Sequence, residues 1–199
     1  VEGKRQGRVR IVANVRHVHA GVTLAVEEEL LTGTALRSCI ADLILANRFL
    51  GQAGERLLDE LHLAAILKEW PDAGVVFKKD SSSLHAMDPH AFLAETLERL
   101  GVETQEDLQL VDEEDILPDL AMEFGLTPAQ LAEFRKDLPR QWTFQGAVYT
   151  CEVSPRARTV LLTPANKAAA KAPPQAWTLP PFRSFTVKYR KASRTVTLR

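Results

Sequence analysis

The chain of 199 residues balances 25 Lys and Arg against 26 Asp and Glu, and 45% of its residues are hydrophobic. This composition excludes a wholly disordered chain, and the length allows one sizeable core or a few small ones. No apolar run approaches the roughly 20 residues that span a bilayer, so we expect a cytoplasmic protein without a membrane partner.

Residues 1–7 are typical of a linker, and they lack the apolar core of a signal peptide. Because the chain starts with Val1, we interpret it as a piece of a longer protein. Cys39 and Cys151 lie far apart along the chain. We expect two reduced thiols rather than a disulfide, as is usual inside cells.

Alternating apolar and polar residues over 8–19 and again over 22–29 predict an N-terminal β-hairpin that turns at Ala20-Gly21. In that pairing the acidic run Glu27–Glu29 faces the arginines of the first strand. We expect these side chains to form cross-strand charge pairs. The arginines concerned are Arg8, Arg10 and Arg16.

Two helices are predicted next, over 35–50 and 55–70, because leucine and isoleucine recur there at helical spacing. Gly51 ends the first helix and Pro71 ends the second. A short strand over 75–77 completes a first segment, 1–80, which we expect to combine the hairpin with the helix pair.

The second predicted segment, 88–138, is a compact bundle of five short helices with its own small core. Capping residues followed by proline mark two of the helix starts, at Asp88-Pro89 and at Thr127-Pro128. Over 98–137 twelve acids stand against three bases, a net charge of −9. Because many of these acids open helices, capping is the default interpretation of their role. The predicted helices cover 89–100, 106–110, 113–117, 119–124 and 129–137.

The third predicted segment, 140–199, is an antiparallel β-sheet or a small barrel, which makes the whole chain an α+β protein. The stretch 164–177 is rich in Ala, Pro and Lys, and we expect it to be a flexible loop that buries little. The predicted strands cover 142–144, 147–153, 158–163, 182–190 and 194–199.

The third segment is strongly basic, with eleven Arg and Lys against the single acid Glu152, a net charge of +10. This excess is more than solubility requires, and it favours contact with the phosphates of a nucleic acid. Four aromatic residues could add stacking faces for bases: Trp142, Trp177, Phe182 and Tyr189. The expected contact set consists of cations on the closing strands: Arg183, Lys188, Arg190, Lys191, Arg194 and Arg199.

No catalytic or nucleotide-binding motif is recognisable, so we expect a protein that is not an enzyme and has no cofactor. His17-x-His19 could place two imidazoles on one side of a strand, and His85 and His90 flank Asp88. Neither pair has the further ligands that a metal site needs, so we expect no metal. Ser81–Ser83 near His85 is more typical of a solvated loop than of a nucleophile and its base.

Several stretches together resemble the C-terminal accessory region of bacterial DEAH-box ATP-dependent RNA helicases. These stretches are Thr104–Leu108, Glu113–Leu117, Leu131–Pro139, Trp142–Tyr149 and Val160–Ala165. In that family the helical part follows the motor domains, and the β part helps to hold the translocated strand. The motor's own motifs are absent, so the resemblance implies a non-catalytic accessory module that binds RNA before DNA.

A shorter stretch, 88–138, also resembles the five-helix sterile alpha motif. The likeness lies in Leu97–Val102, Glu113–Ile116 and Gly125–Thr127. Such domains mostly bind one another through complementary charge, and some bind RNA hairpins. This resemblance implies the alternative function, a protein-interaction adaptor whose acidic helices meet a protein partner or a larger parent chain.

Overall fold

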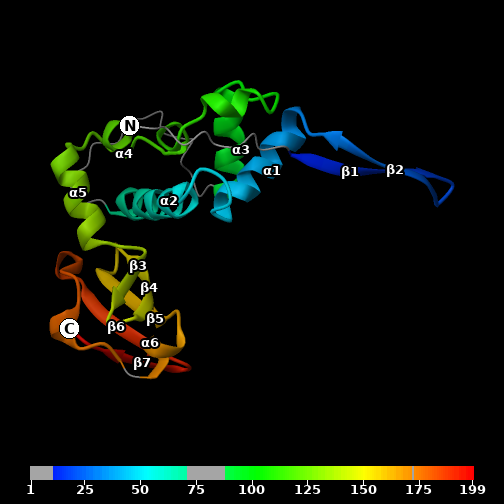
Figure 1. The fold of residues 1–199 in the computed structure, drawn as a ribbon. Helices are drawn as coiled ribbons and strands as arrows, with labels where there is room; N and C mark the ends of the chain where they lie inside the picture. The colour runs from blue at the N-terminus through cyan, green and yellow to red at the C-terminus, as the bar shows by residue number, and fades with distance from the viewer. Residues whose placement is uncertain (1–10, 71–87, 172) are drawn as a thin grey trace, which may run out of the picture. The chain divides into compact units, whose positions relative to one another are not determined.

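The computed structural model describes residues 11–70, 88–171 and 173–199. The fold is α+β, as predicted, with a two-stranded ribbon, a set of helices and a five-stranded sheet (Figure 1). The chain forms two compact units. The N-terminal unit comprises Val1–Leu57 and Met87–Leu117, and the C-terminal unit comprises Leu58–Ala86 and Pro118–Arg199. Each unit therefore takes two separate stretches of chain, unlike the consecutive segments 1–80, 88–138 and 140–199 expected from the sequence.

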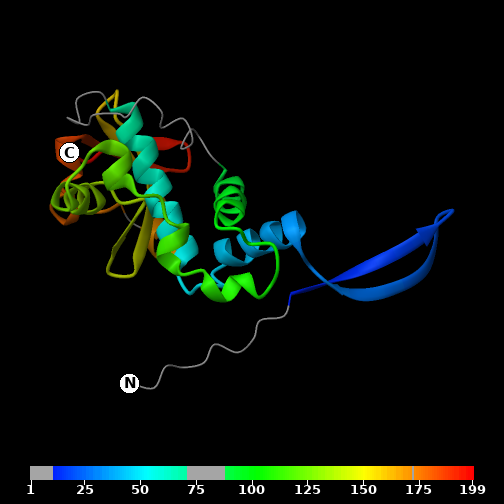
Figure 2. The same ribbon diagram turned by 90° about the horizontal axis from the view of Figure 1, so that it is seen from above.

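The predicted hairpin is confirmed as β1 (Val12–His19) paired antiparallel with β2 (Val22–Leu30). Ala20 and Gly21 form the turn with positive φ of 48° and 79°, which glycine adopts without strain. A bulge interrupts the register between His17 and Val18. Within the N-terminal unit the ribbon extends away from helix α1 (Gly33–Leu45), as Figures 1 and 2 show.

The register separates Arg16 from two of the three acids with which charge pairs were expected, whereas Glu28, opposite Asn14, shares the face of Arg16. Glu27 lies opposite Val15 and Glu29 lies opposite Ala13, whereas Arg16 lies opposite Val26. Because opposed residues share a face and neighbours alternate, Arg16 is on the other face from Glu27 and Glu29. Arg8 and Arg10 lie outside the described residues.

The core of the N-terminal unit forms between α1 and α3 (Pro89–Arg99), whose apolar faces pack together. Its fully buried side chains include Leu36, Ile40, Ile44, Leu93 and Leu97. Arg37 crosses the edge of this core with only 7% of its side chain exposed, and it pairs with Glu103 at 2.7 Å. It also donates to the Val102 carbonyl at 3.1 Å. This arginine thereby ties α1 to the chain that follows α3.

The helix predicted over 35–50 corresponds to α1, which ends earlier than expected, at Leu45. Asn47 and Leu50 both have a φ of 54°, which no α-helix accommodates. Helix α2 (Ala53–Glu69) follows and confirms the second predicted helix. The predicted strand over 75–77 and the loop at Ser81–Ser83 lie outside the described residues.

The short helices after α3 occur where the sequence predicts them, but they do not form one bundle. Helices η3 (Asp107–Leu110) and η4 (Glu113–Ile116) belong to the N-terminal unit. Helices α4 (Leu120–Phe124) and α5 (Pro128–Asp137) belong to the C-terminal unit, because their apolar side chains pack into the core beside the sheet. Those side chains are Leu120, Phe124, Leu131 and Phe134.

The C-terminal sheet has the strand order β3-β4-β5-β6-β7, with β3 and β7 at its edges. All neighbouring strands are antiparallel except β5 and β6, which are parallel, so the sheet is mixed rather than wholly antiparallel. The parallel pair is possible because a long connection separates β5 from β6. The strands are β3 (Gln141–Phe144), β4 (Ala147–Ser154), β5 (Thr159–Pro164), β6 (Thr186–Lys191) and β7 (Arg194–Thr197).

The connection from β5 to β6 carries α6 (Lys167–Lys171), η5 (Ala176–Thr178) and η6 (Phe182–Ser184). The prediction of a flexible loop that buries little is therefore wrong over α6. Ala169 is fully buried in the core, and its carbonyl accepts a hydrogen bond from the Tyr189 hydroxyl at 3.1 Å. Asn166 fixes the start of α6, because its Oδ1 accepts from Ala169 N at 2.9 Å.

One face of the sheet is the inner face, which carries Val160, Leu162, Val187 and Tyr189 and packs against α2, α4 and α5. Each such fully buried side chain stabilises the fold by about 1.5–3 kcal/mol. The opposite side, the outer face, alternates with these residues along every strand. It is the outer face that positions the candidate site.

Candidate nucleic-acid interface

The outer face of β6 and β7 joins cations to hydroxyl groups. Lys188 lies opposite Thr197 and Arg190 lies opposite Thr195 in the antiparallel register. Thr186 precedes Lys188 on the same face of β6. The alternation seen in the sequence therefore predicts correctly that these five side chains share a face.

The hydroxyl surface continues across the rest of the sheet. Thr159 on β5 is the register partner of Thr186 on β6, and Thr150 on β4 faces Thr163 on β5. Sequence reasoning did not include these threonines in the site, although the period-two pattern of β4 and β5 would have found them. These threonines surround Leu161, which lies between Glu152 and Lys188, so the outer face combines hydrogen-bonding groups with an apolar side chain.

Glu152 is the one acid on the outer face of the described strands. Its Oε1 lies 3.5 Å from a guanidinium nitrogen of Arg190, and both side chains are about half exposed, at 56% and 44%. An exposed ion pair of this kind contributes at most about 1 kcal/mol. Arg190 can therefore exchange Glu152 for a phosphate at little cost.

Lys191 and Arg194 form the last register pair of the β6–β7 hairpin, beside its two-residue turn. By alternation they lie on the side of Tyr189, not on the outer face. Lys191 Nζ lies 3.5 Å from the Lys171 carbonyl. Both cations are exposed at the hairpin's end, so they border the outer face instead of belonging to it.

Arg199 and Arg183 are engaged within the C-terminal unit. Arg199 donates to the carbonyls of Pro180 and Pro181 at 3.0 and 2.7 Å. Arg183 pairs with Asp137 at 2.9 Å and with Glu133 at 3.6 Å. Local sequence cannot reveal these contacts, because each depends on tertiary placement.

The guanidinium of Arg183 also lies over the Phe134 ring, 4.3 Å from its centroid. The residue itself lies in η6 with a positive φ of 49°. Acids and an aromatic ring of α5 thus hold Arg183, and its expected role as a free phosphate contact does not fit this position.

The aromatic residues named as stacking faces are mostly engaged in packing. Phe182 and Tyr189 are buried, and Trp142 stacks on Tyr149 with 5.1 Å between ring centroids. Trp177 is 79% exposed, but it contacts Phe144, which alternates with the outer-face residues of β3. Base stacking therefore has no platform among the described residues of the outer face.

The acids of the helical stretch have local structural roles. Asp107 accepts hydrogen bonds from the backbone of Thr104 and of Glu103, and these bonds hold the pKa of its carboxyl below the usual range. Glu113 and Glu114 pair with Arg56 at 2.8 and 2.9 Å. The default interpretation of capping and local pairing thus describes these acids.

A cavity of about 280 Å³ opens in the C-terminal unit between α2 and β4. Burial lowers the pKa of His62 at its wall to about 4, and the charge of Arg140 adds to that shift. Burial also raises the pKa of the neighbouring Cys151 thiol to about 12. A neutral imidazole beside a protonated thiol lacks the thiolate that nucleophilic chemistry requires. Both cysteines are free thiols in the structure.

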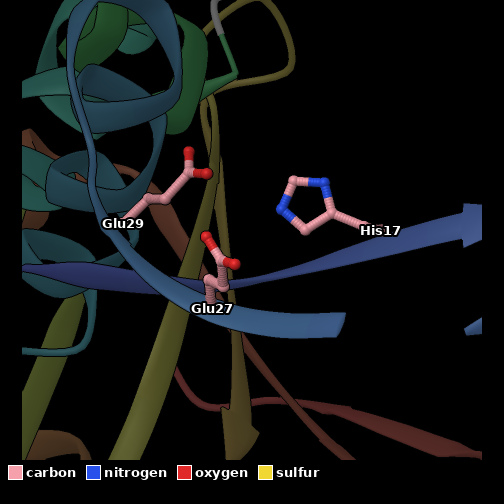
Figure 3. Close-up of side chains that lie close together, drawn as sticks. All are labelled: His17, Glu27 and Glu29. Atoms are coloured by element: carbon pink, nitrogen blue, oxygen red, sulfur yellow. The ribbon is translucent and has the colours of Figure 1, made fainter. Parts of the chain in front are cut away.

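The histidines considered for metal binding lie in different settings. The bulge after His17 interrupts the alternation that would align it with His19. His90 Nε2 lies 3.1 Å from the Ser38 carbonyl, and His85 is outside the described residues. Across the described chain one group could hold an ion, formed by His17, Glu27 and Glu29 of the ribbon (Figure 3).

Among the described helices none combines the length and apolar character needed to cross a bilayer. The resemblance to helicase accessory regions rests on sequence stretches alone. No protein-family model, curated protein or solved structure matches the chain.

Proposed function

We propose that the chain is a non-catalytic, cytoplasmic module that binds nucleic acid, RNA before DNA, through the outer face of its C-terminal sheet. The observation that carries this proposal is the alignment of Lys188 and Arg190 with threonines of the adjacent strand. Cations and hydroxyls at strand spacing suit a phosphate backbone, where anionic oxygens recur along one line.

The binding energy in this proposal comes mainly from counterion release. A cation that neutralises a phosphate frees a condensed counterion, so affinity falls as salt rises. The hydroxyls of Thr186, Thr195 and Thr197 add hydrogen bonds to phosphate or sugar oxygens. None of these groups distinguishes one base from another, so we expect binding with little sequence preference.

The preference for RNA over DNA rests on the resemblance of residues 104–165 to helicase accessory regions. In such a setting the module would accompany a motor carried by a longer parent chain. Because the outer face offers hydroxyls and cations and no stacking platform, we assign the contact to the strand's backbone and not to its bases.

The contact set in this proposal is narrower than the six cations expected from the sequence. Lys188 and Arg190 form its centre, and Lys191 and Arg194 extend it at the end of the hairpin. Arg183 and Arg199 are assigned structural roles by their contacts with Asp137 and with the Pro180 and Pro181 carbonyls.

The test is a titration of fluorescent single-stranded RNA with the wild-type chain and with the double variant Lys188→Ala, Arg190→Ala. We expect the variant to bind about tenfold more weakly at low salt, because two phosphate contacts are lost. The plot of log affinity against log salt should also become shallower by about 1.4, since each contact to a single strand contributes about 0.7.

The matched control is Arg99→Ala with Lys136→Ala, which removes the same two charges from exposed positions on α3 and α5. We expect its affinity and salt slope to stay close to those of the wild type. Equal losses in both variants would show a general charge effect and contradict the assigned surface. Salt-insensitive binding, or self-association in sedimentation without any RNA binding, would overturn the proposal in favour of the adaptor.

A further inference from the structure

The ribbon of β1 and β2 gathers three potential metal ligands on one face. His17 lies opposite Ala25, Glu27 opposite Val15 and Glu29 opposite Ala13, so the three alternate along the same face. Figure 3 shows the imidazole of His17 extending from β1 towards the two carboxylates of β2. The ligand atoms of the three side chains all lie within 4.8 Å of one another.

The separation of these atoms is within reach of what one ion requires. Zinc binds imidazole nitrogen and carboxylate oxygen at about 2.0–2.2 Å in tetrahedral geometry, so two donors on one ion stand about 3.4 Å apart. The remaining difference, at most about 1.4 Å, is closed when these exposed side chains rotate about their own bonds. Alanines opposite His17 and Glu29 leave both side chains room for that movement.

The charge on this face also favours a cation. The arginine of β1, Arg16, lies on the other face of the ribbon, and no Lys or Arg within the described strands β1 and β2 shares the face of Glu27 and Glu29. Two carboxylates at this separation repel each other, and an ion between them removes that repulsion. The imidazole nitrogen then determines which class of metal ion the three side chains prefer.

We propose that His17, Glu27 and Glu29 bind a divalent ion of the zinc class across the ribbon. One nitrogen and two oxygen donors suit Zn²⁺ and its transition-metal neighbours, whereas Mg²⁺ and Ca²⁺ prefer oxygen donors alone. Three protein ligands leave at least one coordination position for water or for a group on another molecule. The ion joins β1 to β2 next to the bulge and so stabilises a two-stranded ribbon that is otherwise marginal.

The test is calorimetric titration of the 199-residue chain with Zn²⁺ at neutral pH, with Mg²⁺ in excess. We expect the wild type to bind one equivalent more than His17→Ala, Glu27→Gln or Glu29→Gln at the same free Zn²⁺. Loss of an outer-shell partner typically costs about 10- to 100-fold in metal affinity, so loss of a direct ligand should cost at least about tenfold. Backbone amide NMR signals of β1 and β2 should shift on addition of Zn²⁺.

Two matched controls share the ribbon but not the site. Glu28→Gln removes the same charge from the opposite face, and His19→Ala removes an imidazole beyond the bulge. Both should keep the wild-type stoichiometry and affinity. Circular dichroism without metal should show the same fold for all variants, because every substituted side chain is exposed. A wild type that binds no more Zn²⁺ than His17→Ala, or an equal loss in Glu28→Gln, would overturn the proposal.

Discussion

His62 links protonation to the stability of the C-terminal unit. Its side chain is largely buried at the cavity beside Arg140, and burial lowers its pKa from 6.5 to about 4. Among the described residues its Nε2 has no hydrogen-bond partner. In the folded chain the imidazole therefore stays neutral at a pH where the unfolded chain has already bound a proton.

Between pH 6.5 and pH 4 the unfolded state binds one more proton at His62 than the folded state does. The free energy of unfolding therefore falls as the pH is lowered through this window, by at most about 3 kcal/mol. We predict that His62→Leu removes this part of the pH dependence. Urea unfolding at a series of pH values measures this effect. The difference in the free energy of unfolding between wild type and variant should change only between pH 6.5 and pH 4.

The exposed Met122 supplies the control, since Met122→Leu changes no titratable group and should leave the pH profile of unfolding as it is in the wild type. A His62→Leu profile parallel to the wild-type profile from pH 7 to pH 4 would contradict the assigned role. Such a result would mean that His62 titrates alike in the folded and unfolded chain.

The sequence predicts only some of the cations that remain available for a partner. Alternation along the closing strands correctly places Lys188 and Arg190 on one face, because side-chain direction follows from the strand itself. The pairing of Arg183 with Asp137 depends on where α5 packs, and no local pattern records that. The ligand set proposed around His17 was not predicted for the same reason, since it depends on the register that brings Glu27 and Glu29 beside His17.

At the scale of elements, α6 depends on one side chain. Asn166 Oδ1 accepts hydrogen bonds from Ala169 N at 2.9 Å and from Val148 N at 3.2 Å. Its Nδ2 donates to the Gly146 carbonyl at 2.8 Å. Asn166 thus acts as a cap for α6 and joins it to the β3–β4 turn.

We predict that Asn166→Ala lowers the free energy of unfolding of the C-terminal unit by about 1–3 kcal/mol, because several hydrogen bonds are lost at once. Denaturant unfolding measures the change. Asn166→Asp keeps the acceptor and loses only the bond to Gly146, so its cost should be smaller. Equal stability of Asn166→Ala and the wild type would show that α6 does not need this cap.

The short helices were the most predictable elements, because capping residues mark their starts in the sequence. Thr127 caps α5 as predicted, and it forms a capping box with Gln130, in which Thr127 N donates to Gln130 Oε1 at 2.9 Å. The parallel pairing of β5 with β6 was not predictable, since alternation shows which face a residue takes and not which strand lies beside it. Helix α6 was missed because composition favoured a loop, although its alanines are strong helix formers.

At the scale of the whole molecule, two units share one chain by interleaving. The N-terminal unit combines Val1–Leu57 with Met87–Leu117, and the C-terminal unit combines Leu58–Ala86 with Pro118–Arg199. Linear changes in composition therefore do not mark the unit boundaries. The acidic stretch is divided in the same way, so that Glu133 and Asp137 balance Arg183 within the C-terminal unit.

The two units should respond separately to damage in their cores. Leu36 is fully buried in the N-terminal unit, and we predict that Leu36→Ala costs about 2–5 kcal/mol there. Hydrogen exchange read by mass spectrometry should show faster exchange in α1 and α3, with little change in β4–β6.

The matched substitution is Val160→Ala, at a fully buried position of the sheet. It should have the reverse effect, with faster exchange in β4–β6 and unchanged protection in α1 and α3. If either substitution loosened both units equally, the chain would unfold as one cooperative body, and the division into two units would not describe its energetics.

The parallel seam between β5 and β6 has a consequence for the order in which the sheet assembles. Strands β4 and β5, like β6 and β7, are neighbours in sequence and can pair across tight turns within microseconds. Thr159 and its partner Thr186, in contrast, meet only after the long intervening stretch has closed on itself, at a cost in chain entropy. We therefore expect two hairpins to form early and to dock against each other late. Until they dock, the apolar inner faces of both hairpins stay exposed and can bind other chains.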